Sequence, residues 1–359
     1  MKLYIGLMSG TSMDGIDAAL VDVETHQLIA GITRPYSPST LVQLQQLCNK
    51  QEGTLAFIAQ LHRKIGIEFA AAVEDLMQAS NVDKSVIKAI GSHGQTITHD
   101  TSAAIPYTIQ LGCPHTIAEL TKLKVVADFR TRDMVRKGQG APFAPLYHQA
   151  LFAKKSELIA VVNIGGISNI TFLHNETVQG FDIGPGNCLL DAWINQCRNK
   201  PFDKDGQWAS SGVVLPELLE AFKTDPYFNM DPPKSVGKEY FSLEWLKAFN
   251  ITTYKEGDVQ ATLLALTVDS IIQTIRAYPI TTNKLLLCGG GAHNQKLVAS
   301  MRENFPELLI ETTATYGVNP DYLEAMMFAW LADKTLNQEA VDLRSITGAE
   351  TIGMLGAVY

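Results

Sequence analysis

The chain opens with a strand, a glycine-containing turn and two further strands. Residues 2–8 are nearly continuously apolar, which is typical of a strand buried on both faces. A polar turn at 10–15 follows, and return strands are expected at 16–23 and 27–33. The opening therefore predicts a sheet whose first strand lies inside the fold.

The second half of the chain opens in the same order. An apolar strand at 158–164 leads through Gly165 and Gly166 into strands at 168–173 and about 177–182. Few residues are identical between the halves, so the likeness is one of element order. A duplicated fold explains it, although α/β chains also resemble one another at this coarse level.

Helices and strands alternate after each opening, which predicts an α/β fold with mixed sheets flanked by helices. Helices are expected at 54–79, 116–120, 188–196, 260–278, 295–304 and 320–334, and strands at 86–92, 107–111, 124–129, 284–288 and 308–312.

A length of 359 residues suggests about two domains. We expect one domain at 1–131 and a second at 132–344, with a strand-like tail at 345–359 that returns to the first. Residues 199–253 are rich in Pro, Asp, Lys and aromatic residues and are expected to form a partly irregular insertion.

Composition excludes several classes of protein. The formal charge of −8 argues against general binding to nucleic acid or anionic membranes. No apolar run approaches the roughly 20 residues of a membrane span, and the first residues lack the features of a signal peptide. The five cysteines include no Cys-x-x-Cys pair, which favours reduced thiols in the cytoplasm.

The first turn has the residues of a phosphate site. Gly10 and Gly15 allow close backbone approach, and Thr11 and Ser12 offer hydroxyl and amide donors. An ordinary hairpin turn is the alternative, because Gly, Ser and Asp are common in turns. The turn is neither a Gly-x-x-x-x-Gly-Lys-Ser/Thr phosphate loop nor a Gly-x-Ser-x-Gly nucleophile elbow.

Two carboxylates in or beside this turn are candidates for a metal ion. Asp14 and Asp17 are suited to Mg²⁺, directly or through water, because that ion prefers oxygen ligands and keeps much of its hydration shell.

Two further glycine turns, both in the second half of the chain, also have the features of a phosphate site. One opens the half, and the other places three glycines between a buried strand and a helix, where a ring or phosphate can lie against the backbone. A tight strand-to-helix turn is the alternative interpretation of the latter. The residues of the second half that are expected to contact a nucleotide are Asn163, Gly165, Gly166, Gly184, Gly186, Gly289, Gly290, Gly291 and Asn294.

Asp182 is the candidate general base. It follows a strand and precedes Gly184 and Gly186 and the start of a helix, a place where side chains converge in α/β sheets. A role as turn or cap residue is less favoured, because Asn187 already stands where a cap is needed.

Charged residues elsewhere are candidates for substrate contacts. Glu324 lies on the same stripe of its predicted helix as several apolar residues, so its carboxylate is either paired in the core or faces a ligand. Arg130 can clamp an anion through its fork of donors, although a surface salt-bridge cluster is a fair rival. His93, Gln95 and Thr96 follow a strand and are expected to form a polar substrate loop rather than a metal site.

Four segments together resemble the anhydro-N-acetylmuramic acid kinase family, and the three glycine turns resemble the phosphate-1, phosphate-2 and adenosine motifs of the actin/Hsp70/hexokinase superfamily. The segments are MSGTSMDG at 8–15, GSHGQT at 91–96, NIGGISN at 163–169 and FDIGPGN at 181–187. The resemblance runs over essentially the whole chain.

The resemblance implies a two-domain actin/hexokinase-like (ribonuclease H-like) fold with an ATP cleft between the domains. It implies a cytoplasmic, homodimeric enzyme of cell-wall recycling that converts 1,6-anhydro-N-acetylmuramic acid, ATP and water to N-acetylmuramic acid 6-phosphate and ADP, with Mg²⁺. Asp182 matches the catalytic aspartate, and Thr96, Arg130 and Glu324 match positions that contact the sugar. A hexose or amino-sugar kinase and a nucleotide-dependent assembly protein remain rival interpretations.

Overall fold

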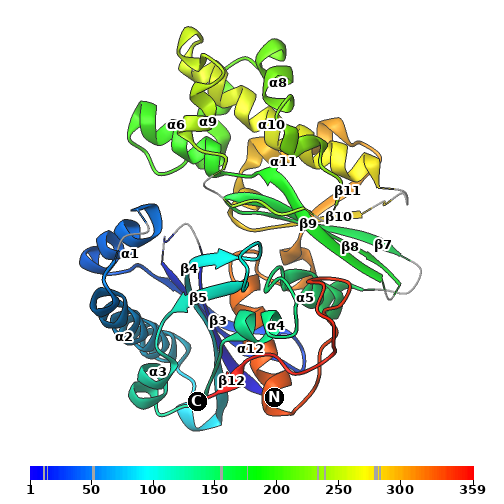
Figure 1. The fold of residues 1–359 in the computed structure, drawn as a ribbon. Coiled ribbons are helices and arrows are strands. Elements are labelled where there is room, and N and C mark those ends of the chain that lie inside the picture. The colour runs from blue at the N-terminus through cyan, green and yellow to red at the C-terminus, as the bar shows by residue number, and fades with distance from the viewer. Residues whose placement is uncertain are drawn as a thin grey trace. The chain divides into compact units, whose positions relative to one another are not determined.

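The computed structural model describes residues 1–10, 13, 15–50, 53–153, 157–175, 177–232, 234–237, 240–278, 282 and 284–359. The chain divides into two compact units (Figure 1). The first unit comprises residues 1–147 and 317–359, and the second comprises residues 148–316.

The first unit is built on a mixed sheet. Among the described residues the sheet has seven strands in the order β12-β6-β4-β1-β2-β3, with β5 paired to β4. β1 pairs antiparallel with β2 and parallel with β4, so it lies inside the sheet as predicted. The strands are β1 (Leu3–Ser9), β2 (Ile16–Asp22), β3 (Gln27–Arg34), β4 (Ile87–Asp100), β5 (Tyr107–Leu111), β6 (Val125–Ala127) and β12 (Ala357–Val358).

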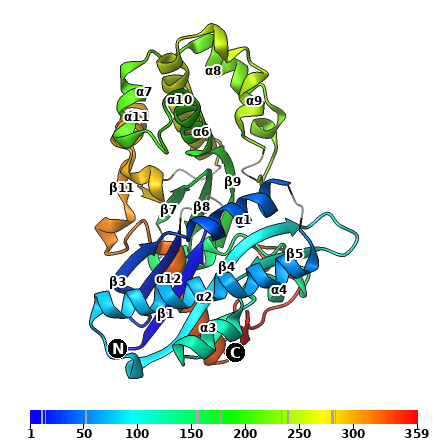
Figure 2. The ribbon, with the colours of Figure 1, turned by 90° about the vertical axis from the view of Figure 1, so that its left-hand side faces the viewer.

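Helices cover both faces of this sheet (Figures 1 and 2). They are α1 (Pro38–Lys50), α2 (Leu55–Ser80), α3 (Pro114–Thr121), α4 (Phe129–Met134) and α12 (Leu323–Leu336), while α5 (Ala144–Phe152) spans the junction between the units. Successive side chains of β1 point to opposite faces. Leu3, Ile5 and Leu7 share one core with the apolar stripe of α2, and Gly6 meets α12 on the other face.

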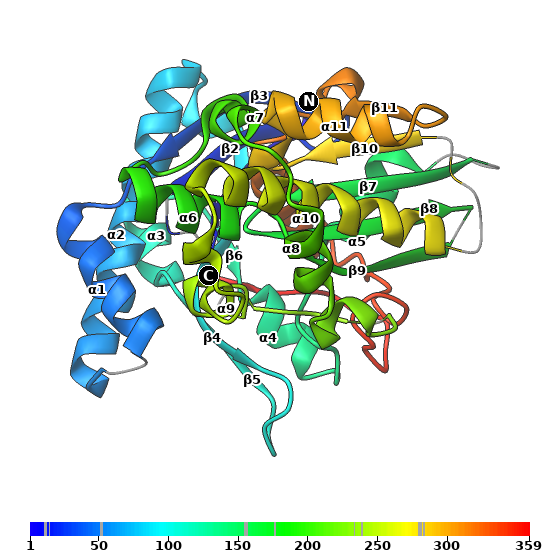
Figure 3. The ribbon, with the colours of Figure 1, turned by 90° about the horizontal axis from the view of Figure 1, so that it is seen from above.

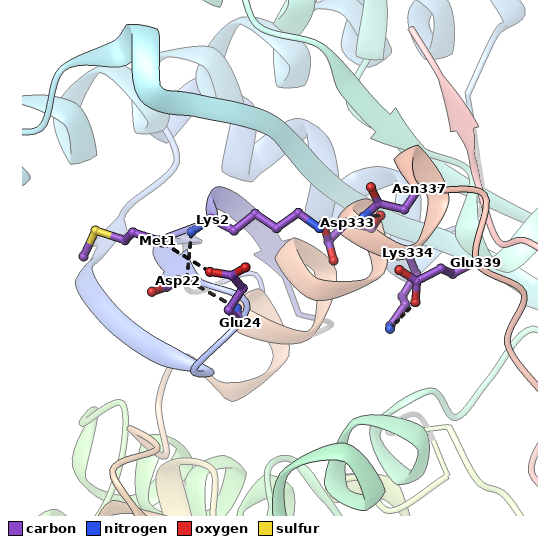
Figure 4. Close-up of polar contacts among 8 residues, drawn as sticks. All are labelled: Met1, Lys2, Asp22, Glu24, Asp333, Lys334, Asn337 and Glu339. Atoms are coloured by element: carbon purple, nitrogen blue, oxygen red, sulfur yellow. Dashed lines mark hydrogen bonds and ion pairs between the residues drawn. The ribbon is translucent and has the colours of Figure 1, made fainter.

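Glycines in two strands allow α12 to lie directly against the sheet. A Cβ on Gly6 would come within 1.7 Å of the carbonyl oxygen of Ala325, and one on Gly91 would come within 1.9 Å of that of Phe328. An ion pair holds the end of the helix, because Lys2 Nζ lies 2.7 Å from Asp333 Oδ1 (Figure 4).

The second unit repeats the sheet of the first. Its described strands are β7 (Leu158–Ile164), β8 (Ile167–His174), β9 (Thr177–Pro185), β10 (Lys284–Cys288) and β11 (Leu309–Thr312), in the order β11-β10-β7-β8-β9. β7 to β9 are antiparallel, and β10 and β11 continue parallel to β7. β1 to β4 and β6 have the same order and orientations. The predicted duplication and the actin/hexokinase-like fold class are therefore confirmed.

The region predicted to be a partly irregular insertion at 199–253 contains several short helices and contributes to the second core. Its buried aromatic and aliphatic side chains there are Trp208, Ala209, Leu218, Phe222, Tyr227, Phe241, Leu246 and Ile251. The helices of this unit include α6 (Cys188–Arg198), α7 (Gln207–Ser211), α8 (Pro216–Lys223), α9 (Leu243–Lys247), α10 (Glu256–Ala277) and α11 (Gln295–Asn304), together with the 3₁₀ helix η3 (Pro226–Asn229).

Four local expectations differ from the structure. The sequence patterns do not predict α1, and the strand expected to end near Phe129 stops at Ala127 because α4 begins there. β4 continues past Ser92 to form a hairpin with β5, which projects as a two-stranded ribbon (Figure 3). The boundary expected at 131/132 lies at 147/148, and the chain re-enters the first unit at 317 rather than 345. The return is early because α12 packs on β1 and β4, which are central strands of the first sheet.

Candidate functional site

A buried glutamine on β4 holds the first glycine turn. Gln95 Nε2 donates to the carbonyl oxygen of Gly10 at 3.2 Å, and its Oε1 lies 2.7 Å from Ser9 Oγ. Ser9 Oγ also lies 2.8 Å from the carbonyl oxygen of Gly15. Gln95 is fully buried, so it ties the start of the turn at Gly10 to β4. The other predicted turn residues, Thr11, Ser12 and Asp14, lie outside the described residues.

Arg130 and His93 form a linked pair in the first unit. Arg130 Nε donates to His93 Nε2 at 2.7 Å, and Arg130 Nη1 donates to the carbonyl oxygen of Gly140 at 3.1 Å. His93 Nδ1 lies 2.9 Å from the carbonyl oxygen of Gly94, which requires a proton on Nδ1. Burial, with a smaller contribution from the Arg130 charge, lowers the pKa of His93 well below its usual range. The neutral imidazole therefore fixes the guanidinium in place.

Glu324 carries a carboxylate that has no hydrogen bond or ion pair to any described residue. It stands in the first turn of α12 and is only partly exposed. Burial raises the pKa of Glu324, the charge of Arg130 lowers it in part, and the charge of Asp17 raises it further. Glu324 therefore lies within electrostatic range of both Arg130 and Asp17.

The remaining substrate candidate, Thr96, lies on β4, three residues after His93. Its Oγ1 accepts a hydrogen bond from Gln110 Nε2 at 3.2 Å on the paired strand β5. The hydroxyl can still donate, because a Ser or Thr hydroxyl has one donor and two acceptor positions.

A magnesium ion has limited support from the described side chains. No group of three or more His, Cys, Asp or Glu side chains within the described ranges could hold a metal. Asp17 Oδ1 accepts a hydrogen bond from Thr33 Oγ1 at 2.6 Å. One carboxylate still fits Mg²⁺, because that ion keeps several waters and takes further ligands from substrate phosphates.

In the second unit the three glycine segments meet at one end of the sheet. Gly186 N donates to the carbonyl oxygen of Gly166 at 2.8 Å, and Asn187 N donates to that of Gly165 at 2.8 Å. A Cβ on Gly289 would come within 2.2 Å of Asn163 Oδ1. Turns that lie far apart in the sequence thus form a surface with few side chains, and side chains at these positions would fill it.

Asn294, which is predicted to contact the nucleotide, caps α11. Its Oδ1 accepts a hydrogen bond from Leu297 N at 3.1 Å. The adjoining loop approaches it closely, because a Cβ on Gly206 would come within 2.5 Å of the same oxygen. The side chain of Asn294 therefore orders the turn that follows the three glycines.

Asp182 projects from β9 with one carboxylate oxygen held and the other open. Oδ2 accepts hydrogen bonds from Ser235 Oγ and Val236 N, both at 3.0 Å, whereas Oδ1 accepts none from any described residue. Burial raises the pKa of Asp182, and the two hydrogen bonds lower it in part. A fixed, partly buried carboxylate with a free oxygen has the geometry of a general base.

Sequence reasoning does not identify the residues around Asp182. Ser235, Val236 and Tyr227 come from the inserted region, where no glycine turn or charged motif marks them. The available signal is the density of aromatic residues, which are unusual in a surface insertion and indicate a packed subdomain.

No helix in the described part of the chain is long and apolar enough to cross a membrane.

Comparisons with known proteins identify the family of this chain. The sequence model of the family described as "Anhydro-N-acetylmuramic acid kinase" matches residues 2–359. Proteins of that name from Legionella pneumophila (strain Corby) and Xylella fastidiosa are 57% and 44% identical, over 100% and 99% of this chain and 98% and 96% of theirs.

Among solved structures, component A of the Acidaminococcus fermentans (R)-2-hydroxyglutaryl-CoA dehydratase aligns with a TM-score of 0.48. The two chains are 11% identical over 92% of this chain and 97% of that one. A likeness at that level carries no argument about function. The sequence match over the full length does carry such an argument. The chain belongs to the anhydro-N-acetylmuramic acid kinase family.

Proposed function

We propose that this chain converts 1,6-anhydro-N-acetylmuramic acid, ATP and water to N-acetylmuramic acid 6-phosphate and ADP, in the recycling of cell-wall sugars. Family membership supports the substrate and reaction. The observation that carries the chemistry is the Asp182 carboxylate, which is held through Oδ2 and whose Oδ1 accepts no hydrogen bond from the residues that the structure describes.

The reaction needs a proton acceptor for water. Asp182 takes a proton from a water molecule, and the resulting oxygen attacks C1 of the anhydrosugar. The C1–O6 bond breaks, and O6 becomes the nucleophile toward the γ-phosphorus of ATP, releasing ADP. A glycosidase usually needs a second carboxyl group to protonate its leaving oxygen. Here the phosphoryl group takes the charge of O6, so one general base is sufficient.

The other predicted site residues receive distinct roles in this proposal. Arg130, Glu324 and Thr96 contact the sugar. His93 and Gln95 act indirectly, because their polar atoms already hold Arg130 and the first glycine turn. The glycine segments of the second unit and the first turn contact the nucleotide, where backbone amides position the phosphates.

Mg²⁺ is expected as the counter-ion of ATP, with Asp17 as a ligand through water. When bound, it supplies charge neutralisation at the phosphate oxygens. A homodimer and a cytoplasmic location stay predictions, supported only by the resemblance to the family.

A coupled assay of ADP release with 1,6-anhydro-N-acetylmuramic acid tests the proposed reaction. Reaction in ¹⁸O-labelled water should place the label at C1 and not in the phosphate. No turnover of the anhydrosugar, together with normal turnover of a simple hexose, would indicate a plain sugar kinase instead.

The first prediction concerns the general base. Asp182→Asn should retain ATP binding and reduce kcat by about 10²- to 10⁴-fold, the usual contribution of a positioned base. The amide oxygen can still accept from Ser235 and Val236, so the local structure should survive. ATP affinity by calorimetry is the control, and substantial remaining turnover would refute the role.

A further inference from the structure

Among the described residues, four hydrogen bonds link the inserted region to Asp182. Asp182 N donates to the carbonyl oxygen of Lys234 at 3.0 Å, and Tyr227 Oη donates to the carbonyl oxygen of Asp182 at 2.9 Å. Ser235 Oγ and Val236 N both donate to Oδ2. The backbone and the carboxylate of this residue are therefore both held by residues from one region.

Two of these partners, Lys234 and Tyr227, are held by contacts that do not involve Asp182. Lys234 Nζ donates to the carbonyl oxygen of Tyr227 at 3.2 Å and lies 4.8 Å from the centre of its ring. Tyr227 is buried in the second core, and Tyr227 N donates to Asp225 Oδ1 at 2.9 Å. The backbone at Ser235 therefore follows directly after a residue that is held by the packed subdomain.

Both hydrogen bonds that the described residues donate to the carboxylate fall on the same oxygen, Oδ2. A carboxylate rotates easily about its last bond, because that torsion has a broad energy profile. Two donors at Oδ2 oppose the rotation and leave Oδ1 as the oxygen that can receive a proton. Val236 supplies a backbone amide, which substitution does not remove, so the hydroxyl of Ser235 is the donor that a variant can test.

We propose that Ser235 is a positioning residue for the general base: its hydroxyl holds Oδ2 of Asp182 so that Oδ1 faces the reacting water. The proposal rests on the function proposed above. The competing explanation is that Asp182 only anchors the inserted region, in which case the hydrogen bonds serve folding and not catalysis.

Ser235→Ala separates the two explanations. Removing the donor should lower kcat roughly 10- to 100-fold, because misplacing a catalytic group costs that much, while KM for the sugar changes little. The acidic limb of the kcat profile should also move to higher pH, since a hydrogen bond to the carboxylate favours its charged form. Ser235→Thr keeps the hydroxyl and should restore both the rate and the pH profile.

Ser211→Ala is the matched control. Ser211 lies in the same region, and its Oγ donates to the carbonyl oxygen of Trp208 at 2.7 Å rather than to Asp182. This variant should keep the wild-type rate and pH profile. The proposal is overturned if Ser235→Ala keeps the wild-type acidic limb, or if Ser235→Thr is as impaired as Ser235→Ala.

A measurement without turnover keeps this test apart from that of the proposed function. The ¹³C carboxyl signal of Asp182, assigned by its loss in Asp182→Asn, should titrate at higher pH in Ser235→Ala than in the wild type. An unchanged titration overturns the positioning role, whatever the substrate proves to be. A shifted titration with no turnover of the anhydrosugar would instead refute only the substrate.

Discussion

His148 is fully buried in the second unit, where its Nδ1 lies 2.9 Å from Thr171 Oγ1. Its Nε2 has no hydrogen-bond partner among the residues that the structure describes. Burial lowers the pKa of His148 to about 3. A histidine in the unfolded chain has a pKa near 6.5. As the pH falls below that value, the unfolded state therefore binds a proton at His148, whereas the folded state does not.

The second prediction follows from this difference. The stability contributed by neutral His148 is fully present above about pH 6.5 and is lost progressively toward pH 3, at up to about 1.4 kcal/mol per pH unit. His148→Gln removes the titrating group. The free energy of unfolding of this variant should therefore fall less steeply than that of the wild type as the pH is lowered from 7 to 5. Thermal unfolding at several pH values measures both slopes; parallel slopes would contradict the assignment. The third prediction, which also belongs to the scale of single residues, is the effect of the Ser235 variants described above.

At the scale of elements, α12 depends on glycines in the strands beneath it. A Cβ on Gly6 would meet three backbone atoms of the helix, the Ala325 carbonyl oxygen and carbon and Ala329 N, within 2.9 Å. The fourth prediction is that Gly6→Ala destabilises the protein by about 3 kcal/mol or more, because backbone cannot yield as a side chain does. Activity should also fall, since Glu324 moves with α12.

Gly348→Ala is the control for this prediction. Gly348 has a φ of 77°, but a Cβ at this position would meet no atom within 4 Å, so substitution costs only the backbone strain of about 1 kcal/mol. Equal losses in denaturant unfolding for the two variants would show that contact with α12 is not the cause.

Most elements are predictable at this scale, and the failures have physical reasons. The strands of both openings and the helix α2 follow apolar periodicity, which is local to each segment. The apolar pattern ends β4 at Ser92, but β5 extends the strand by pairing with its second half. α4 resembles the end of a strand in sequence because Phe129 continues the apolar run, whereas in the structure Phe129 packs against Phe328 of α12.

At the scale of the whole molecule, the two units differ in how the chain forms them. The second unit is continuous, from residue 148 to 316, whereas the first needs its final segment from residue 317 onward. That segment contains α12, whose Met326, Phe328 and Ala329 side chains are buried.

The fifth prediction uses this difference. A chain ending at residue 316 should keep a folded second unit, but its first unit should not fold. Without α12, the sheet of the first unit would expose to water the face that this helix covers. Residues 148–316 alone should fold, since they have their own core. Hydrogen exchange by mass spectrometry can follow each unit separately. Equal protection of β1 in the truncated and full chains would contradict the prediction.

The amino-acid sequence by itself determined the two strand–glycine turn–strand openings, the fold class, the family and the candidate base Asp182. These depend on local signals: apolar periodicity, glycine where backbones must approach, and motifs of a few residues. Only the tertiary structure decided that α12 belongs to the first unit, that His93 serves Arg130, and that Ser235 holds Asp182. Ser235 and Asp182 are separated by 53 positions, and such contacts form because packing brings distant segments together, which no local pattern records.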